Sequence, residues 1–177
     1  MSEEVAEYVF RVLQHSCNDG IRVSESWLAA GMQGLFAHRQ FTAGEVVCHY
    51  VGMELRTTDA LRLADKSYLM RLGPQVYVDA RPCPLVKARF INDCINPAGW
   101  NVRFEKRPDL IPPQALVVAM RDIGPGEELF ADYGKWYWTG CDVKPTRIPF
   151  AELHKRRELA KAESEEPSEE AGEKNGD

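Results

Sequence analysis

The chain has 177 residues, of which 44% are hydrophobic, and it carries a formal net charge of -5. These values are typical of one globular domain, with no apolar run long enough to span a membrane and no signal-peptide pattern in the acidic start Met1–Glu4. Most of the negative charge follows Ala151, so the nearly neutral remainder gives no indication of nucleic-acid binding.

Residues 1–20 are predicted to form a helical segment. Val5, Val9 and Val12 recur at helical spacing, and Asn18–Gly20 supplies turn residues that end the helix.

Residues 21–140 consist mostly of short strand-like runs, rich in β-branched and aromatic residues and separated by glycine and proline. One internal helix is predicted, from Thr57 to Lys66. The predicted fold class is therefore mainly β, a β-rich α+β protein of antiparallel hairpins rather than an α/β nucleotide-binding fold. The candidate strands are Gly34–Ala37, Glu45–Tyr50, Tyr68–Leu72, Val76–Asp79, Trp100–Phe104, Leu116–Met120 and Glu128–Ala131.

The C-terminal flank, 141–162, contains a predicted short helix from Phe150 to Leu159. The basic tetrad His154–Arg157 is typical of a nuclear localisation signal or of a solvated helix face, and the second reading is preferred. Residues 163–177 are polar and acidic and are predicted to be disordered.

Two segments, Arg39–Glu45 and Arg121–Glu127, share the pattern Arg-x-apolar-x-x-Gly-Glu. Glycine at the same offset predicts the same turn, in a backbone conformation that side chains disfavour. The carboxylates of Glu127 and Glu128 are interpreted as part of a solvated hairpin.

Metal ligands are not apparent. The five cysteines are scattered, odd in number and without a Cys-x-x-Cys pair, and the four histidines show no metal-ligand spacing. The sequence therefore predicts no metal site and a reducing compartment.

Two stretches concentrate polar residues beside apolar ones. The asparagine motif, Arg89–Pro97, reads Arg-Phe-Ile-Asn-Asp-Cys-Ile-Asn-Pro, which suits a tight turn or a site for a polar ligand. The closing motif, Gly126–Gly134, reads Gly-Glu-Glu-Leu-Phe-Ala-Asp-Tyr-Gly and is followed by more aromatic rings. Such rings are typical either of a core and its rim or of a slot for an extended amine-bearing chain.

Together the two motifs resemble the paired signature of the SET-domain lysine methyltransferases. The asparagine motif is similar to the family pattern Arg-Phe-Ile-Asn-His-Ser-Cys-x-Pro, and the closing motif to Gly-Glu-Glu-Leu-x-x-Asp-Tyr-Gly. The remaining matches follow in the family's order and are Gly31–Ala37, Gly44–Glu45, Tyr50–Gly52, Ser67–Tyr68 and Tyr77–Ala80.

The resemblance implies a SET fold of short curved antiparallel sheets, with the asparagine motif threaded through a loop as a pseudoknot. It also implies S-adenosylmethionine as the cofactor on one face and a channel for the substrate lysine from the other. By resemblance the catalytic residues are Tyr50 and Tyr133, the cofactor-binding residues are Gly34, Leu35, Phe36, Tyr68, Arg89, Phe90, Asn92 and Asp93, and the channel is lined by Tyr50, Ala131, Tyr133, Trp136 and Trp138.

The chain departs from the family in two places. Asp93-Cys94-Ile95 stands where the family has His-Ser-Cys, a position that contacts the cofactor largely through its backbone. We therefore expect Asn92→Ala to weaken cofactor binding strongly and Asp93→Asn to matter less. The usual zinc-bearing flanks are not recognisable, so residues 136–138 are expected to close the channel of a minimal, free-standing SET domain.

Ala131 occupies the position two places before the closing tyrosine, where the family often has phenylalanine or tyrosine. A tyrosine there holds a water that blocks further methylation. The resemblance therefore implies room for an already methylated amine, and di- or trimethyl product, unless Trp136 or Tyr137 fills the space.

The function that the resemblance implies is an S-adenosylmethionine-dependent protein-lysine N-methyltransferase. Its expected partner is a protein with an extended lysine-containing segment, first of all a histone tail in the nucleus, with the cytoplasm as the alternative location. The rival functions are a non-histone lysine methyltransferase and an inactive SET-fold binding module. Retention of Tyr50, Asn92 and Tyr133 favours activity, and no contact with nucleic acid or membrane is expected.

Overall fold

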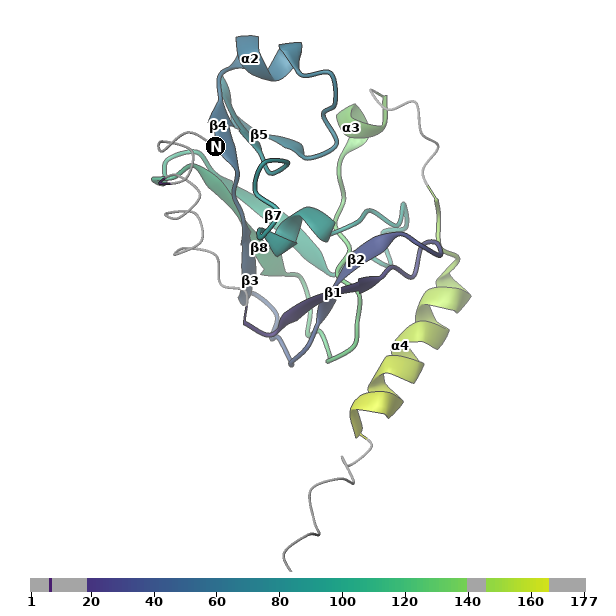
Figure 1. Ribbon diagram of the computed structural model, residues 1–177. Helices are drawn as coiled ribbons and strands as arrows, with labels where there is room; N and C mark the ends of the chain where they lie inside the picture. Colours follow the sequence, from purple (N-terminus) through teal and green to yellow (C-terminus); the bar gives the residue numbers. More distant parts are fainter. Residues whose placement is uncertain (1–6, 8–18, 140–145, 166–177) are drawn as a thin grey trace, which may run out of the picture.

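The computed structural model of the chain describes residues 7, 19–139 and 146–165. Its body consists of three small antiparallel sheets with short helices around them (Figure 1). One sheet pairs β1 with β2, the second has the strand order β3-β8-β7, and the third has the order β4-β6-β5. This architecture confirms the predicted β-rich fold class.

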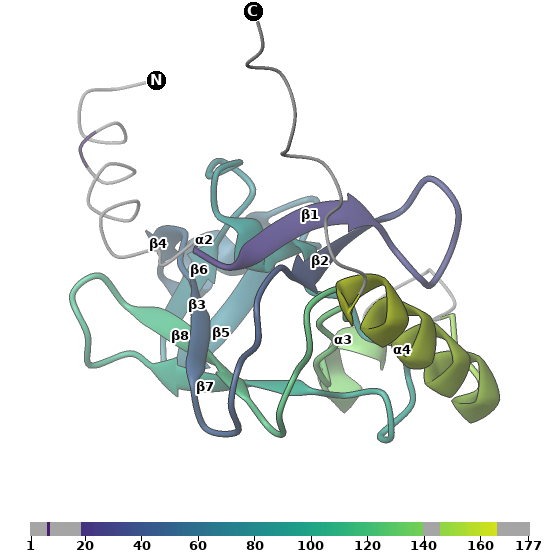
Figure 2. The ribbon, with the colours of Figure 1, turned by 90° about the horizontal axis from the view of Figure 1, so that it is seen from below.

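The strands and helices are short, apart from the last helix. The strands are β1 (Ile21–Glu25), β2 (Gln33–Ala37), β3 (Val46–Tyr50), β4 (Met53–Leu55), β5 (Leu69–Gly73), β6 (Val76–Asp79), β7 (Val102–Arg107) and β8 (Gln114–Ala119). The helices are α2 (Thr57–Arg62), the 3-10 helix η1 (Lys87–Phe90), α3 (Lys135–Thr139) and α4 (Phe150–Glu165). Helices α3 and α4 lie at one end of the molecule, opposite the tip of the β7–β8 hairpin (Figure 2). Among the described residues no helix combines the length and the apolar character that a membrane span requires.

Six of the seven predicted strands are confirmed, with their ends shifted by up to three residues. The seventh, Glu128 to Ala131, is wrong: it forms only isolated bridges, antiparallel from Glu128 to Phe36 and parallel from Phe130 to Asn92. Its two neighbours run in different directions and each meets it at one residue, so no ladder can extend. Strands β1 and β4 are not among the predicted strands, although the less exposed residues alternate with exposed ones in both, as Ile21, Arg22 and Val23 do in β1 and Met53, Glu54 and Leu55 do in β4.

The helices differ from the prediction in length. Helix α2 ends at Arg62, and the next turn is formed by Asp65, whose carboxylate accepts both the backbone N–H and the hydroxyl of Ser67. Helix α4 continues to Glu165, so the predicted disordered tail begins with helical residues. The rest of that tail and nearly all of the predicted N-terminal helix lie outside the described residues.

The two repeated turns adopt the same conformation, as predicted. Gly44 and Gly126 have φ angles of 85° and 83°, in the left-handed region where glycine carries no steric cost. The turns face each other, because Phe41 and Ile123 exchange backbone hydrogen bonds of 3.0 and 2.9 Å.

Helix α4 packs against the back of the asparagine motif. Cys94, Phe130, Ile148 and Leu153 form a buried hydrophobic cluster that joins the two. Backbone pairing supports it, since the Ile148 N–H donates to the Cys94 carbonyl at 3.3 Å. Asn96 completes the junction by donating its side-chain N–H to the Ile148 carbonyl at 2.9 Å.

The basic tetrad is not a uniformly solvated helix face. The guanidinium of Arg157 donates to the carbonyls of Ala98 and Gly99 at 3.1 and 3.3 Å, and its Nε lies 3.3 Å from a carboxylate oxygen of Glu127. The Arg157 side chain is 22% exposed. The solvated-face interpretation is therefore wrong for Arg157, which ties α4 to the second repeated turn.

Candidate active site

The asparagine motif and the closing motif lie side by side. Asn92 and Phe130 form a parallel bridge, and the Ala131 N–H donates to the Asn92 carbonyl at 3.0 Å. The Tyr133 hydroxyl donates to the carbonyl of Ile91 at 2.5 Å. Segments far apart in the sequence are thereby joined, and the closing tyrosine is fixed against the asparagine motif.

Tyr133 is the centre of an aromatic cluster with Tyr137 and Trp138. Its ring lies edge-on to Tyr137, with ring centroids 4.6 Å apart, and stacks on Trp138 at 5.9 Å with an interplanar angle of 17°. Burial raises the pKa of the Tyr133 hydroxyl well above its usual value, and nearby Tyr137 and Tyr50 add to that effect. The hydroxyl is therefore neutral at physiological pH and can act as a hydrogen-bonding group rather than a base.

Tyr50, at the end of β3, is the second buried phenol. Its hydroxyl donates to the carbonyl of Tyr68 at 2.8 Å, and its ring lies edge-on to Phe104 with centroids 5.8 Å apart. Burial and then the negative charge of Asp79 raise the pKa of Tyr50 above its usual value. Both predicted catalytic tyrosines are therefore neutral groups held by backbone carbonyls.

Arg89 organises the predicted cofactor residues Tyr68 and Phe90. Its guanidinium carbon lies 3.9 Å from the centroid of the Tyr68 ring and 5.4 Å from that of Phe90. Its Nη1 donates to the carbonyls of Ala80 and Arg81, both at 3.1 Å. The buried Nε has no hydrogen-bond partner among the described residues, which leaves one donor for a bound molecule.

The side-chain amide of Asn92 has a fixed orientation. Its nitrogen donates to the carbonyl of Gln33 at 2.9 Å, to Oε1 of Glu128 at 3.2 Å and to the hydroxyl oxygen of Ser26 at 3.3 Å. None of its hydrogen bonds in the described part of the chain uses the amide oxygen, which remains able to accept from a ligand.

Glu128 lies at the base of this network and is fully buried, so the solvated-hairpin interpretation is wrong for it. Besides Asn92, its donors are the Ser26 hydroxyl at 2.7 Å and the Trp27 backbone N–H at 2.5 Å. Burial raises the pKa of Glu128 despite these hydrogen bonds, which oppose the shift. Gly34 is required beside it, because a Cβ there would lie 2.1 Å from Oε1 of Glu128.

Asp93 is 3% exposed, and its carboxylate accepts four hydrogen bonds. The donors are the indole N–H groups of Trp100 and Trp138 and the backbone N–H groups of Ile95 and Tyr133. Its side chain therefore connects several parts of the site, a role that was not predicted from the expectation that this position contacts the cofactor largely through its backbone.

The other predicted residues divide into two groups. Leu35 and Phe36 are buried in β2, where the Leu35 carbonyl accepts from Leu129 at 2.7 Å, so their side chains support the site from within the core. Ala131 is also fully buried beside Asn92. Trp136, predicted to line the channel, is 88% exposed and lies outside the aromatic cluster, which argues against the alternative that it fills the space beside Ala131.

Sequence reasoning missed Glu128, Trp100 and Arg157. Glu128 and Arg157 act through partners far away in the sequence, so no local pattern marks them, and Trp100 donates to Asp93, a residue expected to act largely through its backbone. The one available signal is the position of Glu128 directly after the repeated Gly-Glu turn, where the first repeat has Val46 instead. A charged residue at a position that is apolar in the other repeat indicates a special environment.

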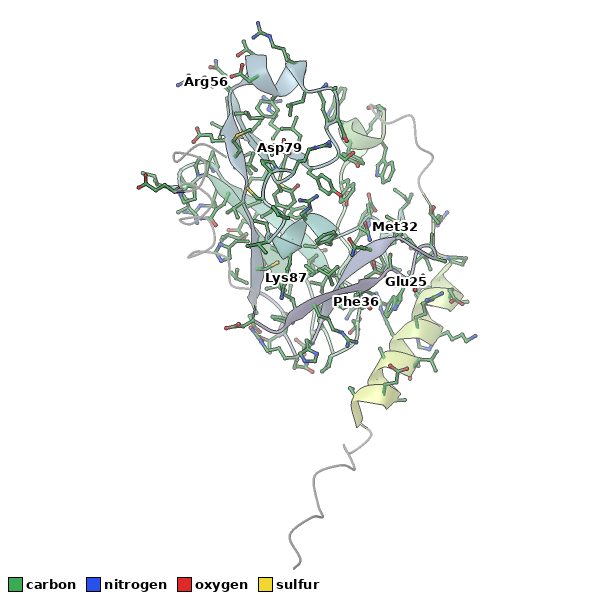
Figure 3. The ribbon with its side chains drawn as sticks, in the orientation of Figure 1. Glu25, Met32, Phe36, Arg56, Asp79 and Lys87 are labelled. Carbon is green, nitrogen blue, oxygen red and sulfur yellow. The ribbon has the colours of Figure 1, made fainter. Side chains whose placement is uncertain are left out.

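Figure 3 shows that the hairpin end marked by Glu25 and Met32 reaches the beginning of α4. Trp27 in the same loop donates its backbone N–H to Glu128. A cavity of about 340 Å³ lies here, lined by residues 25–30 and Arg156. Within the described residues, no group of three or more histidine, cysteine or acidic side chains is placed to hold a metal ion.

Comparison with known proteins identifies the fold. The model of the SET domain family matches residues 32–134. The chain belongs to the SET-domain family. The matched span contains both motifs, both buried tyrosines and Asp93.

Individual relatives agree with this membership. Histone-lysine N-methyltransferase trithorax of Drosophila melanogaster is 29% identical over 136 residues, which is 70% of this chain and 3% of that protein. N-lysine methyltransferase KMT5A-A of Danio rerio is 28% identical over 153 residues, 80% of this chain and 43% of that protein. The chain thus spans less than half the length of either relative.

A solved structure shares the fold. It is a humanized mutant of the Chaetomium thermophilum Polycomb Repressive Complex 2 bound to the inhibitor GSK126. It matches with a TM-score of 0.55 and 25% identity, over 73% of this chain and 18% of that chain.

Proposed function

We propose that this SET domain is an S-adenosylmethionine-dependent protein-lysine N-methyltransferase. The observation that carries the proposal is the fixed position of Tyr133, whose hydroxyl lies against the asparagine motif inside an aromatic cluster. S-adenosylmethionine supplies a methyl group on a sulfonium, which is a good leaving group. Gly34, Tyr68, Arg89, Phe90 and Asn92 would hold the cofactor, with the backbone of Asp93 beside them.

The donor set of the site fits this cofactor. The oriented amide oxygen of Asn92 suits an ammonium group, and the unpaired Nε of Arg89 suits an acceptor. The buried Glu128 carboxylate behind Asn92 has only neutral hydrogen-bond donors, so its negative charge favours a cationic ligand.

The buried tyrosines would prepare the amine. A lysine side chain has a pKa of about 10.4 in water and must lose its proton to act as a nucleophile. An apolar channel lined by Tyr50, Ala131, Tyr133 and Trp138 favours the neutral amine. The neutral Tyr133 hydroxyl would then orient the amine in line with the methyl group, which is the main requirement of a direct transfer.

A histone tail is the proposed substrate class, and the nucleus the proposed location. The family membership and the name of the trithorax relative, a histone-lysine methyltransferase, support this choice. The test is incubation with labelled S-adenosylmethionine and whole histones, beside a nuclear extract without histones. Label on histones that is lost with Tyr133→Phe is expected, whereas label only on other proteins would favour the non-histone alternative.

Cofactor binding has its own test. By calorimetry, Asn92→Ala should weaken S-adenosylmethionine binding by ten-fold or more, on the order of one lost hydrogen bond to a charged group. Asn96→Ala is the matched control, because its amide donates to the Ile148 carbonyl and should affect stability alone. Equal loss of affinity in both variants would contradict the placement of the cofactor.

The number of methyl groups added is expected to follow from the small size of the Ala131 side chain. With Trp136 exposed and Tyr137 beside Tyr133, we expect di- or trimethyl product to accumulate. Mass spectrometry of a peptide substrate over time tests this expectation. Product that stays monomethylated at saturating cofactor would show that Tyr137 restricts the channel.

A further inference from the structure

The carboxylate of Asp93 divides its hydrogen bonds between its two oxygens. Oδ1 accepts from the Ile95 N–H and the Trp100 indole, both at 2.9 Å and both within seven residues of Asp93. Oδ2 accepts from the Trp138 indole at 2.8 Å and the Tyr133 N–H at 3.1 Å, which lie 45 and 40 residues away. One oxygen therefore closes a local turn, and the other holds the end of the closing motif.

An imidazole at this position could not make these contacts. A neutral histidine has one acceptor nitrogen, whereas a carboxylate has two oxygens with about four acceptor sites. Hydrogen bonds to a carboxylate are also roughly twice as strong as those between neutral groups. None of the ion pairs in the described part of the chain involves Asp93, so these four N–H groups carry the compensation of its buried charge.

The position of helix α3 depends on the hydrogen bonds that Oδ2 of Asp93 accepts. This helix has five residues, which is too short for a helix to be stable by itself. Its Trp138 nevertheless stacks on Tyr133 at an interplanar angle of 17°. The bond from the Trp138 indole to Asp93 fixes that ring, and the bond from the Tyr133 N–H to the same oxygen fixes the backbone of the tyrosine.

We propose that the Asp93 side chain is a positioning residue that sets Tyr133 and Trp138 in their reactive arrangement through Oδ2. The proposal rests on the proposed methyltransferase function for its effect on turnover. Its structural part, the anchoring of Trp138, can be measured without any substrate.

The two tryptophans supply a matched pair of variants. Trp138→Phe keeps a ring on Tyr133 and removes the donor to Oδ2, whereas Trp100→Phe removes the donor to Oδ1. We expect Trp138→Phe to lower kcat roughly ten-fold or more, since small displacements of reacting groups are costly. Trp100→Phe should lower the melting temperature and leave kcat unchanged.

Asp93→Asn tests the junction directly. It should lower kcat at least as much as Trp138→Phe, with the affinity for S-adenosylmethionine changed less than about three-fold. In this background Trp138→Phe should have no further effect on kcat, because its donor has already lost the charged acceptor. Additive effects of the two substitutions on kcat would overturn the proposal, as would equal effects of Trp100→Phe and Trp138→Phe.

Indole proton resonances give a readout that needs no activity. The Trp138 N–H should resonate downfield of the exposed Trp136 N–H, which serves as the solvent-like reference, and Asp93→Asn should remove that difference. An unchanged Trp138 resonance in Asp93→Asn would overturn the proposal. Absence of methyl transfer by the unmodified protein would instead contradict the proposed function, because the resonance reports the position of Trp138 by itself.

Discussion

The two repeated turns, Arg39–Glu45 and Arg121–Glu127, have the same local structure and lead to different surroundings. In each, a glycine with positive φ precedes a glutamate that pairs with the arginine at the start, at 2.8 Å in the first turn and 2.6 Å in the second. In each, the glutamate accepts a backbone N–H three residues earlier, from Thr42 at 3.0 Å and from Gly124 at 2.9 Å.

The difference lies in what the chain meets after each turn. After the first, β3 pairs with β8 in an antiparallel sheet that has one register shift between Val46 and Cys48, and Glu45 stays partly exposed. After the second, residues 128–133 cross between β2 and the asparagine motif and make only isolated bridges. The irregular segment leaves side chains such as Glu128 and Tyr133 free to bond to distant residues. The first turn is therefore followed by a strand of a sheet, and the second by the irregular segment that carries Glu128 and Tyr133.

Each turn also delivers one of the two buried tyrosines. Tyr50 follows Glu45 by five residues and Tyr133 follows Glu127 by six. The Tyr50 hydroxyl donates to the Tyr68 carbonyl from a regular strand, whereas the Tyr133 hydroxyl donates to Ile91 from the irregular segment. If the irregular half carries the chemistry, the two tyrosines should differ in their effect on turnover.

The largest expected effect is therefore that of Tyr133→Phe, which should lower kcat on the order of 100-fold, as for loss of one hydrogen bond at a reacting centre. The affinity for S-adenosylmethionine should stay nearly unchanged. Tyr50→Phe should lower kcat less and should cost about 0.5–1.5 kcal/mol of stability, because it removes one hydrogen bond while the Tyr68 carbonyl still accepts from the Ala80 N–H at 3.1 Å. Steady-state kinetics and calorimetry would measure both, and equal kcat losses would remove the distinction between the two halves.

Replacing the glycine of each turn by alanine compares the stability contributions of the two turns directly. Gly44→Ala should cost about 1–2 kcal/mol for a positive φ, since open space surrounds the new Cβ. Gly126→Ala should cost about 1 kcal/mol more, because its Cβ would lie 3.1 Å from the Cβ of Ala160 in α4. Denaturant unfolding would measure the free energies of unfolding.

The control for this pair is Ala160→Gly. In that background Gly126→Ala should cost the same as Gly44→Ala, because only the backbone term is left. A persistent excess cost would mean that contact with α4 is not the cause.

Arg157→Ala should have the next largest effect, about 1–3 kcal/mol, since it leaves the Ala98 and Gly99 carbonyls and Glu127 without this donor. Arg156→Ala on the same helix is the matched control and should change little, because its pair with Glu152 is exposed. Melting temperatures of the two variants would decide, and equal shifts would mean that α4 is not fixed to the second turn by Arg157.

The sequence indicates the fold through features that are local. The glycine turns, the alternating strands and the order of the family motifs are each readable within a few residues, and the repeat Arg-x-apolar-x-x-Gly-Glu correctly predicts one turn twice. Tyr50, Asn92 and Tyr133 follow from the resemblance. The partners of Glu128 and Arg157 and the Oδ2 partners of Asp93 could not be predicted, because they are set by tertiary packing across 30 to 102 residues of sequence.

The smallest expected effect is a dependence of stability on pH that has opposite signs at Glu128 and Glu45. Burial raises the pKa of Glu128, so its contribution to stability is fully present below the unfolded pKa, near 4.5, and is lost as the pH rises through the folded pKa. The stability of the unmodified protein minus that of Glu128→Gln should therefore increase as the pH is lowered from about 8 to 5.

At Glu45, the Thr42 N–H and then Arg39 lower the pKa, so its contribution is present above the unfolded pKa and is lost as the pH falls through the folded pKa. The difference for Glu45→Gln should accordingly decrease at low pH. Ser26→Ala removes a donor that stabilises the Glu128 carboxylate, and it should move the Glu128 transition to higher pH. Chemical unfolding at several pH values would measure these differences, and parallel trends for Glu45→Gln and Glu128→Gln would contradict the assignment of Glu128 to a buried, desolvated site.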